Sequence, residues 1–339
     1  MSTVIRSPNW IGDGIMSLPA IRAFHDLFPG ERLAVAAKGY LAPLFLNIPE
    51  IDEIVPLPDR WTARTLPAAA AGLRRRGFDR GLLFTNSFSS ALLFRLAGIR
   101  PLTGYARDGR GFLLDERIAP PPPSRHHQYY YLNLVERLAG RGAGRPFPAS
   151  LVVTAEEREE AVAWLREQGI AGDRPLLAVA PAAAYGSAKA WLPGRFREFI
   201  AAWLRGRPQS AVLLLGSASE RQRIAEVAAG LPAGAFNLAG RLELRRSIAV
   251  LSLCRLFVGN DSGLMHAAAA LSVPLVAVFG PTAPGSTAPL AGRFRLLHRG
   301  ADCAPCRRRE CPTDHRCMSA VATGEVLEAA ASLWEGGDA

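Results

Sequence analysis

The sequence predicts an α/β protein built from two open, mostly parallel β-sheets with helices on both faces. Its 339 residues exceed what one hydrophobic core usually holds, so two domains are expected. Short apolar strands alternate with amphipathic helices, which is the pattern of parallel sheets. This pattern stops at the four prolines 120–123 and starts again near residue 150. We therefore expect a first domain over 1–150, a second over 151–320 and a C-terminal segment over 321–339.

The first domain begins with a strand–turn–helix unit. Apolar residues predict a strand over 3–6, residues 9–13 predict a turn, and residues 15–28 have the spacing of a helix. Two further apolar runs, at 33–37 and 81–85, predict the next strands of the same sheet.

The second domain begins with a helix signal. Thr154, followed three residues later by Glu157, forms a capping box that predicts a helix through about residue 168. Strands separated by helices are predicted at 176–180, 211–215, 256–259 and 275–279. A last helix is predicted over 321–334, and we expect it to pack back toward the first domain.

The composition is that of a soluble globular enzyme, because 49% of the residues are hydrophobic and 21% are charged. No apolar run approaches the length of a membrane span. Pro8, Gly12 and Asp13 interrupt any signal-peptide core near the N-terminus, so we expect a cytoplasmic protein.

The net charge of +10 comes almost entirely from arginine, since lysines are scarce. One interpretation is an arginine-biased, solvated surface. The other is attraction to anionic partners: a diphosphate donor, a phosphorylated glycolipid or the inner membrane face. Nucleic acid is not expected, because the chain has no basic run interleaved with aromatics and no zinc-finger or RNP pattern.

Two such sheets present the carboxyl ends of their strands to a shared central cleft, so residues that follow strands are candidates for a site. The first candidate is the turn Asn9-Trp10-Ile11-Gly12-Asp13-Gly14, whose glycines let a ligand approach the backbone. Asp13 is either a helix cap or a group that does chemistry. A dinucleotide fingerprint fits poorly, because Ser17 stands where a third glycine or alanine is needed, which disfavours an oxidoreductase.

Three strand ends of the second half carry further candidates. Lys189 follows the strand 176–180 and is either a phosphate-binding charge or an exposed surface lysine. Glu220 follows the strand 211–215, and Gly280-Pro281-Thr282 follows the strand 275–279. Together they indicate a nucleotide-diphosphate site, although no Walker A sequence and no Gly-x-Ser-x-Gly elbow is present.

The segment Asn260-Asp261-Ser262-Gly263-Leu264-Met265-His266 joins a strand to an alanine-rich helix. Asp261 or Ser262 is expected to cap that helix, whose free N–H groups form an anion site. His266 either lines the cleft or is a satisfied core histidine.

These segments together resemble the ADP-heptose:lipopolysaccharide heptosyltransferases, which are glycosyltransferases of family 9 with the GT-B fold, that is, two Rossmann-like domains. The resemblance spans nearly the whole chain and looks closest to the heptosyltransferase II members. The motifs that carry it are Asn9-Trp10-Ile11-Gly12-Asp13 with Leu18-Pro19-Ala20, Asn86-Ser87-Phe88-Ser89-Ser90-Ala91, Ala188-Lys189-Ala190-Trp191-Leu192-Pro193, Leu215-Gly216-Ser217, the segment 260–266 and Phe279-Gly280-Pro281.

The resemblance implies a role for each matching residue. Asp13 would be the general base for the acceptor hydroxyl, and Lys189 would bind the donor diphosphate. Glu220 would contact the nucleoside ribose, and Asp261 the heptose hydroxyls. The remaining donor-side residues would be Ser262, Gly263, Leu264 and His266, with the N–H groups of Gly263 and Leu264 on phosphate. The acceptor-side residues would be Asn9, Trp10, Gly12, Asn86 and Ser87.

The resemblance also implies a reaction: inverting transfer of L-glycero-D-manno-heptose from ADP-heptose to the inner core of lipopolysaccharide, on a lipid A-Kdo-heptose acceptor. No metal or cofactor would be required for catalysis, and the protein would contact the inner membrane peripherally. One departure from related enzymes of the first subtype is that Ala184 and Tyr185 replace hydroxyl side chains before Lys189. The alternatives are heptosyltransferase I or III, or a nucleotide-sugar binding protein without turnover.

Four cysteines cluster near the C-terminus as Cys303-x₂-Cys306-x₄-Cys311-x₅-Cys317, with His315 among them. Tight thiolate spacing in a cytosolic protein favours structural zinc, although the second pair is looser than in usual zinc sites. Plain or redox-labile thiols are an equal alternative, and stable disulfides a weaker one. Cys254 stands alone in an apolar stretch and is expected to be a core residue.

Overall fold

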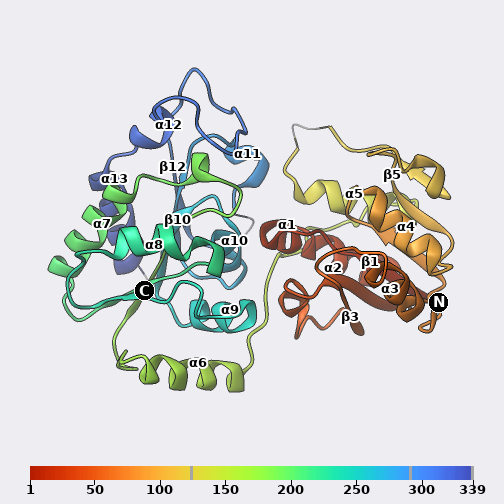
Figure 1. Ribbon diagram of the computed structural model, residues 1–339, viewed down its shortest axis with the longest axis horizontal. Coiled ribbons are helices and arrows are strands. Elements are labelled where there is room, and N and C mark those ends of the chain that lie inside the picture. Colours follow the sequence, from red (N-terminus) through yellow and green to blue (C-terminus); the bar gives the residue numbers. More distant parts are fainter. Residues whose placement is uncertain (123–124, 290–291, 337–339) are drawn as a thin grey trace. The chain divides into compact units, whose positions relative to one another are not determined.

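The structure is a computed structural model that describes residues 1–122, 125–289 and 292–336. The chain divides into two compact units, Met1–Val152 and Val153–Ala339, close to the boundary expected after residue 150. In each unit, helices cover both faces of a six-stranded parallel sheet (Figure 1). The predicted α/β class with two parallel sheets is therefore confirmed.

The sheet of the first unit has the strand order β3-β2-β1-β4-β5-β6, with every pair parallel. Its strands are β1 (Ser2–Arg6), β2 (Arg32–Lys38), β3 (Glu53–Leu57), β4 (Arg80–Leu83), β5 (Leu102–Tyr105) and β6 (Glu116–Ile118). The strand order reverses between β1 and β4, and in open α/β sheets ligands bind at the carboxyl ends of strands at such a switch point.

The helices of the first unit form two layers. They are α1 (Ile11–Met16), α2 (Leu18–Leu27), α3 (Thr65–Arg74), α4 (Phe88–Leu96) and α5 (Gln128–Ala139). α2 packs against α5 on one face, and α3 packs against α4 on the other. Leu73 of α3 and Phe94 of α4 are fully buried against the sheet, so this face carries a continuous apolar core.

The sheet of the second unit has the order β12-β11-β10-β7-β8-β9, again parallel throughout. Its strands are β7 (Leu176–Ala180), β8 (Ala211–Leu214), β9 (Ala235–Asn237), β10 (Leu256–Asn260), β11 (Leu275–Phe279) and β12 (Phe294–His298). In chain order this is the arrangement of the first unit, so the switch point lies between β7 and β10.

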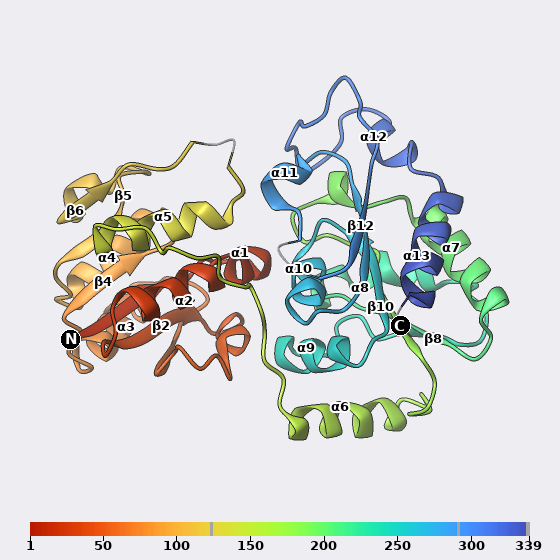
Figure 2. The ribbon, with the colours of Figure 1, turned by 180° about the vertical axis from the view of Figure 1, so that it is seen from behind.

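The helices of the second unit also form two layers, as Figure 2 shows. They are α6 (Ala155–Glu167), α7 (Pro193–Gly206), α8 (Arg221–Ala228), α9 (Leu244–Ser252), α10 (Gly263–Ala270), α11 (Pro284–Thr287), α12 (Arg316–Ser319) and α13 (Thr323–Glu335). α7 packs against α8 and α13, whereas α9 packs against α6 and α10. The capping box predicted at the start of α6 is present, with Thr154 and Glu157 bonded reciprocally.

The last helix, α13, belongs to the core of the second unit. Val326, Ala330, Leu333 and Trp334 are buried there, and the Trp334 ring lies edge-on to Trp203 of α7 at 5.1 Å. Its apolar stripe packs against α7 and the sheet of the second unit, and packing of this helix toward the first domain stays a prediction. Residues 337–339 of the predicted segment lie outside the described residues.

One predicted boundary differs from the structure. The helix predicted over 15–28 is two helices, α1 and α2, which meet at Ser17. Pro19 lies in the first turn of α2, where its missing N–H costs nothing, whereas it would interrupt a continuous helix. Of the proline run, 120–122 lie outside helices and strands, and Pro123 lies outside the described residues. No helix in the described ranges is long and apolar enough to cross a membrane.

Candidate functional site

Most candidate residues of each unit lie at the switch point of its sheet, whereas Glu220 follows β8. In the first unit, Asn9–Asp13 follow β1, and Asn86 and Ser87 follow the neighbouring strand β4. In the second unit, Lys189 follows β7, and Asp261 follows the neighbouring strand β10. Each unit therefore gathers most of its candidates at the carboxyl edge of its two central strands.

Asp13 is the third residue of α1 and is not its N-cap. The N-cap is Trp10, which makes no side-chain capping bond. The Asp13 carboxylate instead lies beside an imidazole, with Oδ1 3.3 Å from Nε2 of His127. Of the two interpretations of Asp13, helix capping is therefore not what its side chain does in this structure.

An aromatic cluster at the start of α5 surrounds this carboxylate. His127 Nε2 lies 3.1 Å from the Tyr131 hydroxyl, and the imidazole stacks on the Tyr130 ring at 5.4 Å. Burial raises the pKa of the Tyr131 hydroxyl well above its usual value, and the charge and hydrogen bond of Asp13 raise it further. This cluster could not be predicted from the sequence, because it lies more than a hundred residues from Asp13 along the chain.

Asn86 belongs to the same polar network. Its Oδ1 accepts hydrogen bonds from the Tyr130 hydroxyl at 3.0 Å and from Nη2 of Arg110 at 3.5 Å. Arg110 is fully buried, and burial lowers its pKa to about 10. Ser87 is the N-cap residue of α4, and its hydroxyl lies 2.7 Å from that of Ser90.

Asn9 is held by a second buried arginine. Nη2 of Arg6 donates to Asn9 Oδ1 at 2.7 Å, and burial lowers the pKa of Arg6 to about 10. Trp10, the next residue, exposes 48% of its surface, and Gly12 is the second residue of α1. The loop after β1 thus has an anchored asparagine side chain and an exposed aromatic ring.

In the second unit, Lys189 and Asp261 form a buried ion pair. Nζ of Lys189 lies 2.6 Å from Oδ2 of Asp261, and the two side chains expose 13% and 4% of their surface. Two threonine hydroxyls donate to the same oxygen, Thr282 at 2.7 Å and Thr287 at 3.4 Å. Lys189 is therefore not the exposed surface lysine that the sequence left open.

Asn260 fixes the backbone around this pair. Its Oδ1 accepts from the N–H of Trp191 at 2.8 Å, and its Nδ2 donates to the carbonyl of Ala180 at 3.4 Å. This fully buried amide therefore ties the loop that carries Lys189 to the ends of β7 and β10. Asn260 was not predicted to have a role of its own, although a polar residue at the end of an apolar strand was a usable signal.

The first turn of α10 faces the end of β10. Ser262 is the N-cap, and its side chain accepts from the N–H of Met265 at 3.4 Å. Gly263 and Leu264 supply the next N–H groups, which helix geometry leaves without intrahelical partners. His266 is buried, and its backbone N–H donates to the Ser262 carbonyl at 3.3 Å.

The Glu220 carboxylate accepts hydrogen bonds from a residue close to it in the chain. Its Oε2 accepts from the backbone N–H of Ser217 at 2.8 Å and from the Ser217 hydroxyl at 2.7 Å, as part of a capping box before α8. A Cβ on Gly216 would lie 2.3 Å from Cδ1 of Ile224, so a larger residue at this turn would require the Ile224 side chain to shift. The carboxylate is nevertheless partly exposed at the end of β8.

The cysteine segment does not form the predicted zinc site. In the described ranges, no group of three or more cysteine, histidine, aspartate or glutamate side chains is placed to hold a metal ion. Cys317 is buried against Gly280, and Cys311 Sγ accepts the N–H of His315 at 3.4 Å. The thiols are free and spread around the wall of a pocket of about 190 Å³, lined by Cys303, Cys306, Cys311 and Cys317.

This segment instead accepts hydrogen bonds from the loop that carries Lys189. The carbonyl of Arg309 accepts from the N–H of Ala188 at 3.0 Å, and that of Arg307 accepts from the Tyr185 hydroxyl at 2.8 Å. A Cβ on Gly186 would lie 2.2 Å from the Arg309 carbonyl oxygen. Only a glycine therefore allows the two backbones to approach this closely.

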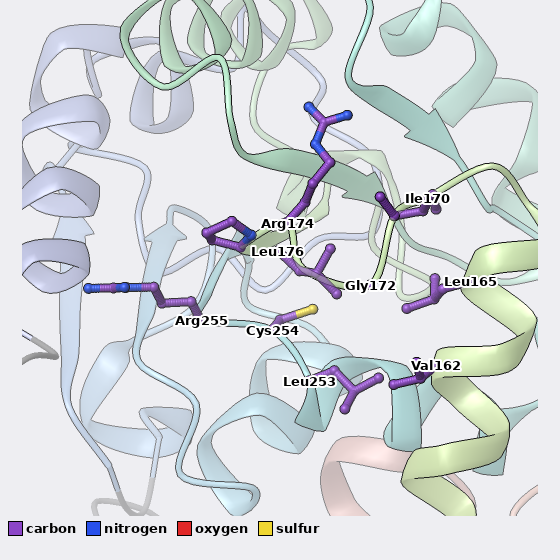
Figure 3. A pocket seen from close by; sticks show the side chains of 11 residues that line it. Val162, Leu165, Ile170, Gly172, Arg174, Leu176, Leu253, Cys254 and Arg255 are labelled. Atoms are coloured by element: carbon purple, nitrogen blue, oxygen red, sulfur yellow. The ribbon is translucent and has the colours of Figure 1, made fainter.

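A separate pocket of about 270 Å³ lies at the opposite, amino edge of the second sheet (Figure 3). Its lining includes Leu165, Leu176 and Cys254, and it contains none of the candidate residues. Burial raises the pKa of the Cys254 thiol to about 12, which fits the expected core residue.

The chain is similar to characterised heptosyltransferases. A profile of glycosyltransferase family 9 (heptosyltransferase) matches residues 68–316. Lipopolysaccharide heptosyltransferase 2 of Salmonella typhimurium and that of Escherichia coli are each 30% identical to the chain, over 88% of both sequences. The solved structure of E. coli ADP-heptose lps heptosyltransferase II superimposes with a TM-score of 0.87 over 100% of both chains, at 27% identity.

Proposed function

The chain belongs to glycosyltransferase family 9 and is a lipopolysaccharide heptosyltransferase of GT-B fold, and on this premise we propose that it transfers L-glycero-D-manno-heptose from ADP-heptose to the inner core, as a heptosyltransferase II. The observation that carries the proposal is the content of the two switch points. One holds a carboxylate, Asp13, and the other holds a cation, Lys189, beside the start of α10.

On the donor side, the second unit would bind the diphosphate. Departure of ADP builds negative charge on the diphosphate, and Lys189 with the N–H groups of Gly263 and Leu264 would stabilise it. These groups are built into the fold, so we propose that catalysis needs no metal ion. Ala184 has no hydroxyl, and the Tyr185 hydroxyl donates to the carbonyl of Arg307, so backbone N–H groups would make the phosphate contacts there.

Asp261 and Glu220 would orient the two sugars of the donor. The hydrogen bonds that Asp261 makes with described residues go to Oδ2, which leaves Oδ1 to accept from a heptose hydroxyl. The partly exposed Glu220 would accept from the ribose hydroxyls through Oε1, since Oε2 is engaged by Ser217. Ser262 and His266 would hold the start of α10 in place.

On the acceptor side, Asp13 would be the general base of an inverting displacement. It would remove the proton of the acceptor hydroxyl as that oxygen attacks the anomeric carbon, and such a base typically contributes about 10²–10⁴-fold. Asn9, Trp10, Gly12, Asn86 and Ser87 lie around it at the same sheet edge and would contact the acceptor sugars.

The acceptor is a lipid, so we propose that the protein works at the cytoplasmic surface of the inner membrane. Exposed aromatic rings at the carboxyl edge of the first sheet support this: Trp10, Tyr40 and Phe88 expose 48%, 45% and 42% of their surface. The net charge of +10 favours an anionic surface. Sedimentation with vesicles of anionic and of neutral lipid measures membrane binding. Equal recovery of the protein with both kinds of vesicle would contradict the proposed preference for an anionic surface.

The test of the proposal is transfer itself. Purified protein with ADP-heptose and a lipid A-Kdo-heptose acceptor should yield an acceptor heavier by one heptose, seen by mass spectrometry. An acceptor that ends at Kdo should stay unmodified. Transfer to the Kdo-terminated acceptor would instead indicate heptosyltransferase I, and donor binding without any product would indicate a nucleotide-sugar binding protein.

A further inference from the structure

We propose that His127 is a positioning residue for Asp13: its Nε2–H donates to Oδ1 and, with the Tyr131 hydroxyl, holds the carboxylate so that Oδ2 accepts the proton of the acceptor. The inference rests on the proposed role of Asp13 as the general base. It adds to that role His127, which is distant from Asp13 along the chain and lies at the start of α5.

The hydrogen-bonding geometry selects one form of the imidazole. Nε2 faces two oxygens, Asp13 Oδ1 at 3.3 Å and the Tyr131 hydroxyl at 3.1 Å. An ionised carboxylate only accepts, whereas a neutral imidazole carries a proton on one nitrogen. If Nε2 lacked its proton, its lone pair would point at the carboxylate. The Nε2–H form removes that repulsion and leaves the tyrosine hydroxyl free to donate to Asp13 as well.

The surrounding rings fix the imidazole plane. Tyr130 lies parallel to it, at 6° and 5.4 Å between centroids, and Tyr131 lies perpendicular, at 89° and 5.2 Å. Tyr130 is itself held by its hydrogen bond to Asn86, and Tyr131 is almost completely buried. These two rings restrict how the imidazole can turn, although 40% of the His127 side chain is exposed.

A fixed donor matters because the carboxylate is only partly buried, with 26% of its side chain exposed. Donors reduce the basicity of a carboxylate, so the benefit lies in geometry. A base must lie within hydrogen-bond reach of its proton in the reactive pose, and small misplacements are costly. In the step itself, the acceptor proton moves to Oδ2, the acceptor oxygen bonds to the anomeric carbon, and the bond to the leaving ADP breaks.

Three variants test this role. His127→Phe keeps a flat ring between the tyrosines but loses the hydrogen-bond donor. We expect kcat to fall about 10- to 100-fold, which is the range for a hydrogen bond to a charged group. The KM values for the donor and for the acceptor should stay nearly constant. His127→Gln places an amide N–H near the same point and should recover a substantial part of kcat. His25→Gln, a matched change at an exposed histidine of α2, should leave kcat unchanged.

A double-mutant cycle separates positioning from a structural effect. In an Asp13→Asn background, His127→Phe should have almost no further effect on kcat, because the group it positions is gone. An equal loss of kcat in both backgrounds would overturn the inference. So would wild-type kcat in His127→Phe, while full activity in Asp13→Asn alone would instead overturn the base assignment of the proposed function.

The imidazole form is measurable without turnover. In protein labelled with ¹⁵N-histidine, the His127 signals should show the proton on Nε2, and they should shift in Asp13→Asn. A dominant Nδ1–H form in the wild type would contradict the inference even if His127→Phe proved too unstable to assay.

Discussion

Lys189→Met is the most informative single change in the second unit, because the lysine both pairs with a buried carboxylate and is proposed to bind the donor. The pair exposes only 13% and 4% of its side chains, so the variant leaves Asp261 charged and buried. Breaking such a pair costs about 3–5 kcal/mol. The Thr282 and Thr287 hydroxyls still donate to Asp261, so we expect the lower end, about 3 kcal/mol. In a unit of this size that lowers Tm by about 6–12 °C.

The same variant should weaken ADP-heptose binding about 10- to 100-fold, the equivalent of one charge-assisted contact to phosphate. Calorimetry of unfolding and of donor binding measures both effects. The matched control is Lys38→Met. Lys38 lies in the first unit and is the only other lysine of the sequence, so its replacement should not change donor affinity. Adding Asp261→Asn to Lys189→Met should restore much of Tm but not donor binding. Unchanged Tm and unchanged affinity in Lys189→Met would refute the reasoning.

Two further predictions concern the loop that carries Lys189 and the cysteines. Gly186→Ala should weaken donor binding about tenfold without unfolding the protein, because its Cβ would lie 2.2 Å from the Arg309 carbonyl oxygen and displace the loop. Titration with ADP-heptose measures the donor affinity, and an unchanged affinity would show that the loop position is unimportant. In peptide mapping after brief alkylation, Cys311 should react before Cys254. Hydrogen bonds from Thr313 and His315 lower the pKa of the partly exposed Cys311 thiol, whereas burial raises the pKa of the Cys254 thiol to about 12, so Cys254 should stay unmodified. The reverse order would contradict the assigned environments.

The sequence was sufficient for the parts of the fold that local pattern specifies. The strands β7, β10 and β11 are five-residue apolar runs buried on both faces, and they were predicted with nearly the observed bounds. The edge strands β6 and β9 are only three residues long and are not apolar runs, so their pattern gave no signal. The position of α13 depends on which apolar surface is left uncovered, and that is a property of the assembled core.

The candidate site divides in the same way. Asp13, Lys189 and Asp261 follow predicted strands, so the rule that sites form at the carboxyl ends of parallel strands located them. His127 follows an irregular, proline-rich connection, and only the packing of α5 against α1 and α2 brings it to Asp13. The partners of Asp13 therefore required the structure, although its position did not.

The most direct test of the central claim is the turnover of Asp13→Asn. Trp10, not Asp13, is the N-cap of α1, so the variant should fold and melt as the wild type does. It should bind ADP-heptose nearly as before, because the proposed donor contacts lie in the second unit. The account predicts a kcat lower by about two to four orders of magnitude with little change in KM, since the carboxylate acts mainly in the transition state. A folded Asp13→Asn protein that transfers heptose at the wild-type rate would contradict it.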